Sequence, residues 1–205
     1  MTQWYDAFGN GNVELGTCWQ TQAPGFHIYR ALSARAGGRY INWIRGDNVA
    51  SAGATKRISH VLPNAADLSI SVEWKFLYRF HDALNTIYFW LFVNDSTLNP
   101  AVAGINGYHL YISPPDAGGR MRLRRLDGGG GIVNIINIAF APDTDEHEIV
   151  VTREVSGANR FWRVYMDQAL VGGPTNEATY GPPTGLYYGI SADDRDQLGE
   201  ILISS

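Results

Sequence analysis

The sequence predicts an all-β protein, an antiparallel β-sandwich that forms one domain over residues 1–205. Three observations predict it. Residues 67–80 alternate between apolar and polar side chains, with Leu77 as the one exception on the polar side, which is the period of a strand with one buried face. Roughly a dozen such short segments recur, with no amphipathic helical pattern between them. The 23 Gly and 9 Pro are spread along the chain, as tight turns between strands require.

The first and clearest element is the strand predicted at 67–80. Its core side is entirely apolar: Leu68, Ile70, Val72, Trp74, Phe76, Tyr78 and Phe80. The other side carries Ser69, Ser71, Glu73 and Lys75, with neither an aromatic platform nor paired carboxylates. We expect a central strand whose polar face meets water or a neighbouring protein.

The next elements predict a meander of antiparallel strands. Residues 86–93 (TIYFWLFV) are apolar on both sides, so this strand needs cover on both faces or an exposed aromatic surface with a use. Strands at 108–112 and 120–126 follow, separated by the turn-forming residues 113–119. A further apolar strand is expected at 132–140, after four glycines at 128–131.

The C-terminal third predicts two hairpins and two closing strands. Residues 148–155 and 161–166 alternate again and are joined by the loop at 156–159. Asp167-Gln168 is a second tight turn, which leads into 169–171. The last strands are expected at 186–191 and 199–204.

Composition limits the functional classes. A chain of 205 residues with 45% hydrophobic residues supports one large core. The net charge of −4 argues against nonspecific nucleic-acid binding. Cys18 is the only cysteine, so an intrachain disulfide and a cysteine-based metal site are excluded. The first residues lack the basic and apolar regions of a signal peptide, and no apolar run is long enough to insert into a membrane.

One basic cluster consists of Arg120, Arg122, Arg124 and Arg125. In a strand the first three share a face, while Met121 and Leu123 point to the other. We interpret this as a solvated strand face, and a binding stripe for an anionic partner is the alternative.

Four groups of motifs follow one another along the chain: Asp6-Ala7-Phe8 with Leu15-Gly16-Thr17-Cys18-Trp19, Asn106-Gly107-Tyr108-His109-Leu110 with the strand at 122–126, His147-Glu148-Ile149-Val150-Val151-Thr152-Arg153, and Trp162-Arg163-Val164-Tyr165-Met166-Asp167. In this order they resemble the concanavalin A-like lectin/glucanase superfamily, including its laminin-G-like domains and its bacterial and phage members. Gln168 stands where the family pattern has Gly. The resemblance implies a jelly roll of two curved sheets in which the first strand (4–8) pairs with the last (200–204). It does not decide between lectins, carbohydrate-binding modules, glycoside hydrolases, polysaccharide lyases and structural modules.

No catalytic site is predicted. The retaining glucanases of this superfamily carry a Glu-x-Asp-x-x-Glu strand, which is missing here. The nearest acidic cluster straddles a loop and the start of a strand and is expected to be structural: Asp143, Asp145, Glu146, His147 and Glu148.

No cofactor is predicted either. Asp193, Asp194 and Asp196 offer oxygen ligands for Ca²⁺ in one loop, but the other ligand positions of an EF-hand are missing. We therefore expect a polar connection between strands, with calcium binding as the weaker alternative.

Glycan binding requires exposed aromatic rings beside hydrogen-bonding groups. The candidates are Trp43, Tyr88, Trp90, His109, Tyr111 and Tyr187, of which Trp43 and Tyr111 are favoured because each has polar neighbours. Trp74 and Trp162 are expected in the core.

The lack of an export signal, combined with the lectin-like pattern, leads to a functional hypothesis. We expect a non-enzymatic structural protein on a virion or particle surface, such as a phage head decoration, fibre or tail module, made in the cytoplasm and able to adhere to glycans. Its partners would be other virion proteins, glycans, or further copies of itself associating through 86–93. A stand-alone carbohydrate-binding lectin-like module is the first alternative, and a polysaccharide-degrading hydrolase or lyase is the last.

Overall fold

The structure of the protein is a computed structural model. It describes residues 3–6, 20–21, 26–30, 39–43, 56–61, 71–79, 86–101, 103–113, 118–141, 143, 145–177, 187–192 and 197–204. Within these ranges the chain forms fifteen strands and no helix, so none of the described residues belongs to a helix that could cross a membrane. The predicted all-β class is confirmed.

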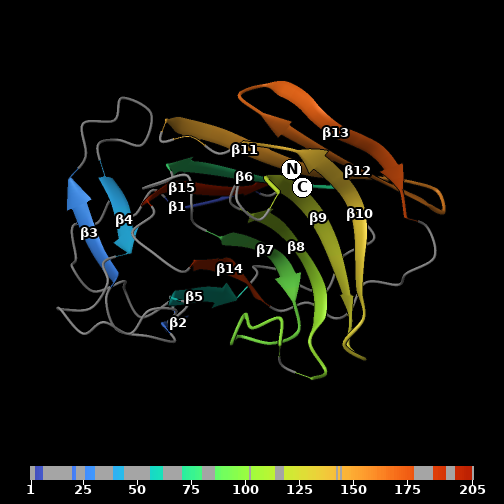
Figure 1. Ribbon diagram of the computed structural model, residues 1–205, viewed down its shortest axis with the longest axis horizontal. Helices are drawn as coiled ribbons and strands as arrows, with labels where there is room; N and C mark the ends of the chain where they lie inside the picture. Colours follow the sequence, from blue (N-terminus) through green and yellow to red (C-terminus); the bar gives the residue numbers. More distant parts are fainter. Residues whose placement is uncertain are drawn as a thin grey trace.

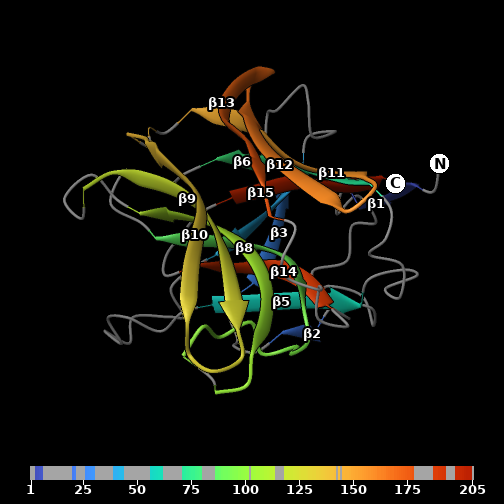
Figure 2. The same ribbon diagram turned by 90° about the vertical axis from the view of Figure 1, so that its right-hand side faces the viewer.

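The strands form two antiparallel sheets, which lie one above the other (Figures 1 and 2). Sheet A has the order β13 (Ala169–Asn176), β12 (Asn159–Met166), β11 (Glu146–Ser156), β6 (Val72–Arg79), β15 (Gln197–Ser204), β4 (Arg39–Trp43) and β3 (Phe26–Arg30), and β1 (Gln3–Asp6) also pairs with β15. Sheet B has the order β10 (Ile132–Ala139), β9 (Arg120–Asp127), β8 (Asn106–Ser113), β7 (Ile87–Val93), β14 (Tyr187–Ala192), β5 (Lys56–Val61) and β2 (Gln20–Thr21).

Strand β6 is central in sheet A, as its alternating sequence predicts, and pairs with β11 and β15. Trp74 and Phe76 are buried, while Glu73 and Lys75 on the opposite face are partly exposed. Lys75 forms an ion pair with Glu148 on the neighbouring strand, so one charge of this polar face is paired within its own sheet. The predicted residues 67–70 and 80 lie outside the described ranges.

The core between the sheets is built from the inward positions of both. Trp74 and Trp162 stack with ring centroids 6.1 Å apart, and Phe76 of sheet A meets Phe89 of sheet B at 4.7 Å. Both tryptophans are fully buried, which confirms their predicted core positions. Each such large apolar side chain stabilises the folded state by about 1.5–3 kcal/mol through the water it releases.

The strand pairing confirms the predicted meander and hairpins. Strands β7, β8, β9 and β10 pair in sequence order, and β11 and β12 are joined by a turn at Gly157-Ala158. Asp167 and Gln168 both have positive φ angles, 48° and 70°, as a two-residue hairpin turn of type I′ requires. The pairing of β1 with β15, Trp4 opposite Ile203, confirms the expectation drawn from the resemblance.

The two sheets approach each other where β10 of sheet B packs against β13 of sheet A, a contact visible at the upper end of the β9–β10 hairpin in Figure 2. Gly172 allows this approach, because a Cβ there would lie 2.6 Å from side-chain atoms of both Ile136 and Ile138.

The sequence pattern did not predict β2, β3, β4 or β5. These strands have two to six residues each, too few for an alternating pattern to stand out from the surrounding loops.

Candidate functional site

The outer face of sheet B gathers most of the aromatic candidates. In β7, β8 and β9 the inward positions include Phe89, Leu110 and Leu123, all fully buried in the core. The alternate positions therefore point outward, and the strand register sets them side by side: Tyr88 opposite Tyr111, Trp90 opposite His109, His109 opposite Arg124 and Tyr111 opposite Arg122. We call these six residues the aromatic–arginine face.

Tyr88 lies at the centre of the aromatic rings of this face. Its ring centroid is 5.0 Å from that of Tyr111, 5.3 Å from that of His109 and 6.0 Å from that of Trp90. Tyr88 and Tyr111 are partly exposed, whereas Trp90 and His109 are fully buried. The two tyrosines reach the surface, and the other two rings lie beside them on the same face without reaching it.

Trp90 is anchored by a hydrogen bond that its Nε1 donates to Oγ of Ser191 on β14, at 2.9 Å. Since Trp90 has no exposed surface, stacking directly on a sugar is not open to it in this structure. The same burial applies to His109. The structure sets both residues beside Tyr88 and Tyr111, but their burial leaves neither ring open to direct contact with a ligand.

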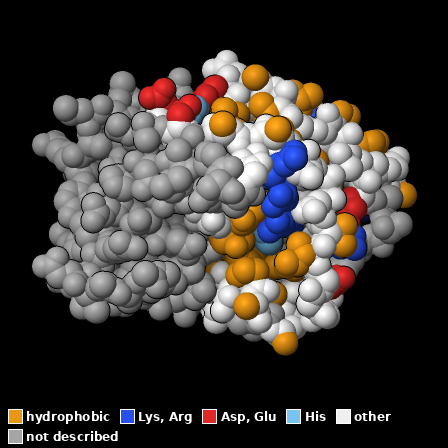
Figure 3. All heavy atoms as spheres, viewed as in Figure 1, with side chains coloured by type: hydrophobic (Ala, Val, Ile, Leu, Met, Phe, Trp, Pro, Cys, Tyr) orange, Lys and Arg blue, Asp and Glu red, His pale blue; other side chains and the backbone are white. Residues whose placement is uncertain are grey.

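The arginines continue the face across β9. The guanidinium of Arg124 lies 3.9 Å from the centroid of the Tyr111 ring and that of Arg122 lies 5.7 Å from it, both in cation–π geometry. Nε of Arg124 donates a hydrogen bond to Oδ1 of Asn134 on β10, at 3.1 Å. Figure 3 shows a column of Lys and Arg side chains beside a group of hydrophobic side chains on this side of the molecule.

Burial and the charge of Arg122 lower the pKa of Arg124, since both disfavour the charged guanidinium. Burial, followed by the charge of Arg124, lowers the pKa of His109 to about 3. Neither ring nitrogen of His109 forms a hydrogen bond with a described residue. His109 is therefore neutral at pH 7, and the positive charge of this face comes from its arginines.

A second apolar cluster closes one end of the face. It contains Trp90, Val93, Leu98, Ile105 and Leu126, and Tyr88 and Tyr187 pack against it. The loop between β7 and β8 supplies Leu98 and is fastened by Asn94, whose Oδ1 accepts a hydrogen bond from the backbone N of Asn106 at 2.7 Å. Tyr187 therefore adjoins the face through this cluster.

Of the six sequence-predicted residues, the structure brings Tyr88, Trp90, His109 and Tyr111 into contact and sets Tyr187 beside them. Trp43 belongs to β4 of sheet A, and its side chain lies outside the described part of the structure. Sequence reasoning did not assign Arg122, Arg124, Asn134 or Ser191 to this site. The alternation of arginines with Met121 and Leu123 is the available signal, and from sequence it favours a solvated face, with a binding stripe for an anionic partner as the alternative.

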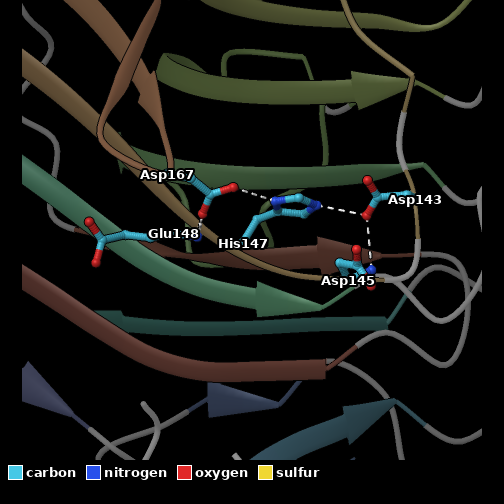
Figure 4. A network of polar contacts seen from close by, with 5 residues as sticks. All are labelled: Asp143, Asp145, His147, Glu148 and Asp167. Atoms are coloured by element: carbon cyan, nitrogen blue, oxygen red, sulfur yellow. Dashed lines mark hydrogen bonds and ion pairs between the residues drawn. The ribbon is translucent and has the colours of Figure 1, made fainter. Parts of the chain in front are cut away.

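The described part of the acidic cluster near the start of β11 is a network of hydrogen bonds around His147 (Figure 4). His147 lies between two carboxylates, with Nδ1 2.7 Å from Oδ2 of Asp167 and Nε2 2.7 Å from Oδ1 of Asp143. Burial lowers the pKa of His147, but its hydrogen bonds to Asp167 and Asp143 outweigh this effect and raise the pKa overall. When the imidazole is protonated, it donates from both nitrogens to these carboxylates and has no lone pair with which to activate a nucleophile.

The other described carboxylates of this cluster, those of Asp145 and Glu148, do not form a catalytic pair. Glu148 points away from His147 and is paired with Lys75. Asp145 is exposed, and its backbone N donates to Oδ1 of Asp143 at 2.9 Å. The side chain of Glu146 lies outside the described set.

The weak calcium candidates Asp193, Asp194 and Asp196 also lie outside the described residues. Among the side chains that are described, no group of three His, Cys, Asp or Glu is arranged to hold a metal ion. Calcium binding at 193–196 stays a prediction.

The sequence matches no protein-family model and no curated protein. The structure, however, is similar to several solved ones. A legume lectin-like domain from Entamoeba histolytica superposes with a TM-score of 0.61 at 13% identity, covering 91% of this chain and 89% of that one. The VIP36 exoplasmic/lumenal domain in its Ca²⁺/Man-bound form gives 0.61 at 10% identity, covering 91% and 82%.

A third similar structure is a Bacillus subtilis protein of unknown function with a galectin-like fold. It gives a TM-score of 0.60 at 10% identity, with 90% of this chain and 88% of that one covered. Identities this low carry information on the fold alone. The chain therefore has the concanavalin A-like lectin/glucanase fold that its ordered motifs resemble.

Proposed function

We propose that this protein is a non-enzymatic, lectin-like carbohydrate-binding module whose ligand lies on the aromatic–arginine face of sheet B. The observation that carries the proposal is the pair of partly exposed rings of Tyr88 and Tyr111, 5.0 Å apart, beside polar side chains of β9 and β10. A sugar needs this combination, because its C–H faces pack on aromatic rings while its hydroxyls require hydrogen-bonding partners.

The face is also held rigidly. Trp90 and His109 pack against Tyr88 on the same sheet face, and Trp90 itself is hydrogen-bonded to Ser191. Arg124 is held between Tyr111 and Asn134. Side chains that are already ordered lose little conformational entropy on binding, so a small ligand retains more of its contact energy.

The similar structures support the same proposal at the level of fold. Two that are named as ligand-bound or as lectins are VIP36 in its Ca²⁺/Man-bound form and peanut lectin. What those proteins bind belongs to them, and the argument for this chain rests on the arrangement of its own side chains.

A glycan array tests the proposal. We expect saturable binding to a subset of saccharides, reduced at least tenfold by Tyr111→Ala or Tyr88→Ala. Tyr165→Ala is the matched control, because Tyr165 is a partly exposed tyrosine on β12 of sheet A, away from this face. Trp43→Ala tests the remaining sequence candidate. A blank array, or equal losses with Tyr165→Ala, would contradict the proposal.

Placement on a virion or particle surface is a separate prediction from the sequence, and nothing in the strand arrangement or the similar structures bears on it. Mass measurement of the native assembly tests it: a monomer in solution would count against a structural particle role and would leave the carbohydrate-binding proposal intact.

A further inference from the structure

Three arginines on β9 of sheet B form no ion pair with an acid among the described residues. Arg120, Arg122 and Arg124 occupy alternate positions of β9, and none of them forms an ion pair within the part of the chain that the structure describes. Three other described cations do have an acidic partner: Lys75 pairs with Glu148, Arg125 of the same strand with Glu177, and Arg163 with Glu154.

The row also differs from an ordinary solvated strand face. Arg124 is partly buried, its guanidinium is 3.9 Å from the Tyr111 ring, and its Nε is bonded to Asn134. That bond uses one of five N–H donors, so the remaining edge of the planar fork stays available for an oxyanion. Arg122 beside it is within cation–π distance of the same ring.

The spacing of the row suits an extended ligand. Successive outward positions of a strand are about 6.6 Å apart, so the three guanidinium groups extend along roughly 13 Å of β9, next to the tyrosines of β7 and β8. A chain molecule that repeats a negative charge could contact the arginines with its charged groups and the tyrosines with its apolar faces.

We infer that the ligand of this face is an anionic saccharide, an oligosaccharide that carries carboxylate or sulfate groups. The inference rests on the proposed carbohydrate-binding function and adds the chemical class of its ligand. Arg122 and Arg124 bind the oxyanions by charge-assisted hydrogen bonds, and Tyr111 with Tyr88 packs against the sugar rings. A single-stranded nucleic acid would meet the same kinds of groups, so a DNA of the same charge is one of the probes in the test.

Matched probes that differ only in charge provide the test. Binding of oligogalacturonate is compared with that of its neutral methyl ester, and binding of a sulfated heparin oligosaccharide with that of its desulfated, N-acetylated form. Titration calorimetry at two salt concentrations gives the affinities. We expect an anionic member of at least one pair to bind at least tenfold more tightly than its neutral counterpart, with an affinity that falls as salt rises.

Variants then locate the charge. Arg122→Gln and Arg124→Gln should each lower the affinity for the anionic probe about tenfold, because a hydrogen bond to a charged group is lost. Arg124→Lys should restore only part of the affinity, since an ammonium lacks the planar fork. Arg163→Gln, which removes a positive charge from sheet A, should leave the affinity unchanged.

The outcomes separate the two proposals. Equal binding of a charged probe and its neutral counterpart would overturn the anionic inference and leave carbohydrate binding in place. Equal losses with Arg163→Gln, or equally tight binding of a single-stranded DNA of the same charge, would overturn it as well. Failure of every saccharide, neutral and anionic, on an array would contradict the proposed function itself. Thermal unfolding of each variant confirms that it is folded, and Arg122→Gln, which removes no hydrogen bond to a described side chain, is the variant least exposed to misfolding.

Discussion

His109 should make the protein sensitive to acid. Its imidazole is fully buried, and burial together with Arg124 lowers its pKa from 6.5 to about 3. Between pH 6.5 and about pH 3 His109 is protonated in the unfolded chain but neutral in the folded one, so the free energy of unfolding falls as pH falls. Lowering the pH from 7 to 5 therefore costs the folded state about 2 kcal/mol through His109 alone. This free-energy cost is nearly the same for any folded pKa of His109 well below 5.

The assay is urea unfolding followed by tryptophan fluorescence at pH 7 and pH 5, for the wild type and for His109→Leu. Leu has no titratable group and fills a similar volume. The wild type should lose about 2 kcal/mol more than the variant over this interval, or about 4–8 °C in melting temperature. Contributions of the other histidines cancel in this double difference. An equal loss in both proteins would refute the reasoning, because it would mean that His109 can be protonated without unfolding.

Three further predictions concern stability and use the same unfolding assay. His147→Gln should destabilise the protein more at pH 5 than at pH 9. Because the pKa of His147 is raised in the folded protein, the stability that its positive charge contributes is fully present below the unfolded pKa of 6.5 and is lost as pH rises through the folded pKa. Equal effects at both pH values would contradict a positively charged His147 between Asp143 and Asp167. Gly173→Ala should cost about 2–4 kcal/mol, since φ is +94° and a Cβ would lie 2.3 Å from the carbonyl oxygen of Trp162; a change below 0.5 kcal/mol would count against this conformation. Gln168→Gly should stabilise the protein by about 1 kcal/mol by relieving the left-handed conformation at the β12–β13 turn, and a loss of stability would show that the Gln168 side chain has a role of its own.

The sandwich was predictable because its strands are long and one-sided. The alternation around Trp74 and Phe76 identifies a buried face without any tertiary information, and the turns at Gly157-Ala158 and Asp167-Gln168 carry local turn chemistry that fixes where each hairpin bends. The short strands β2 to β5 could not be recognised in this way, since their pairing depends on distant partners such as β14 and β15.

The candidate site, like the fold, has some features that the sequence predicts and others that depend on how the strands pair. Alternation along each strand is enough to predict that Tyr88 shares a strand face with Trp90, His109 with Tyr111 and Arg122 with Arg124, because period two is a property of the extended backbone. Tertiary structure is needed to establish that these three strands are neighbours, in a register that sets Tyr88 opposite Tyr111 and His109 opposite Arg124. It also decided which rings reach the surface, since the burial of Trp90 and His109 depends on how neighbouring strands and loops pack around them and not on their own alternation.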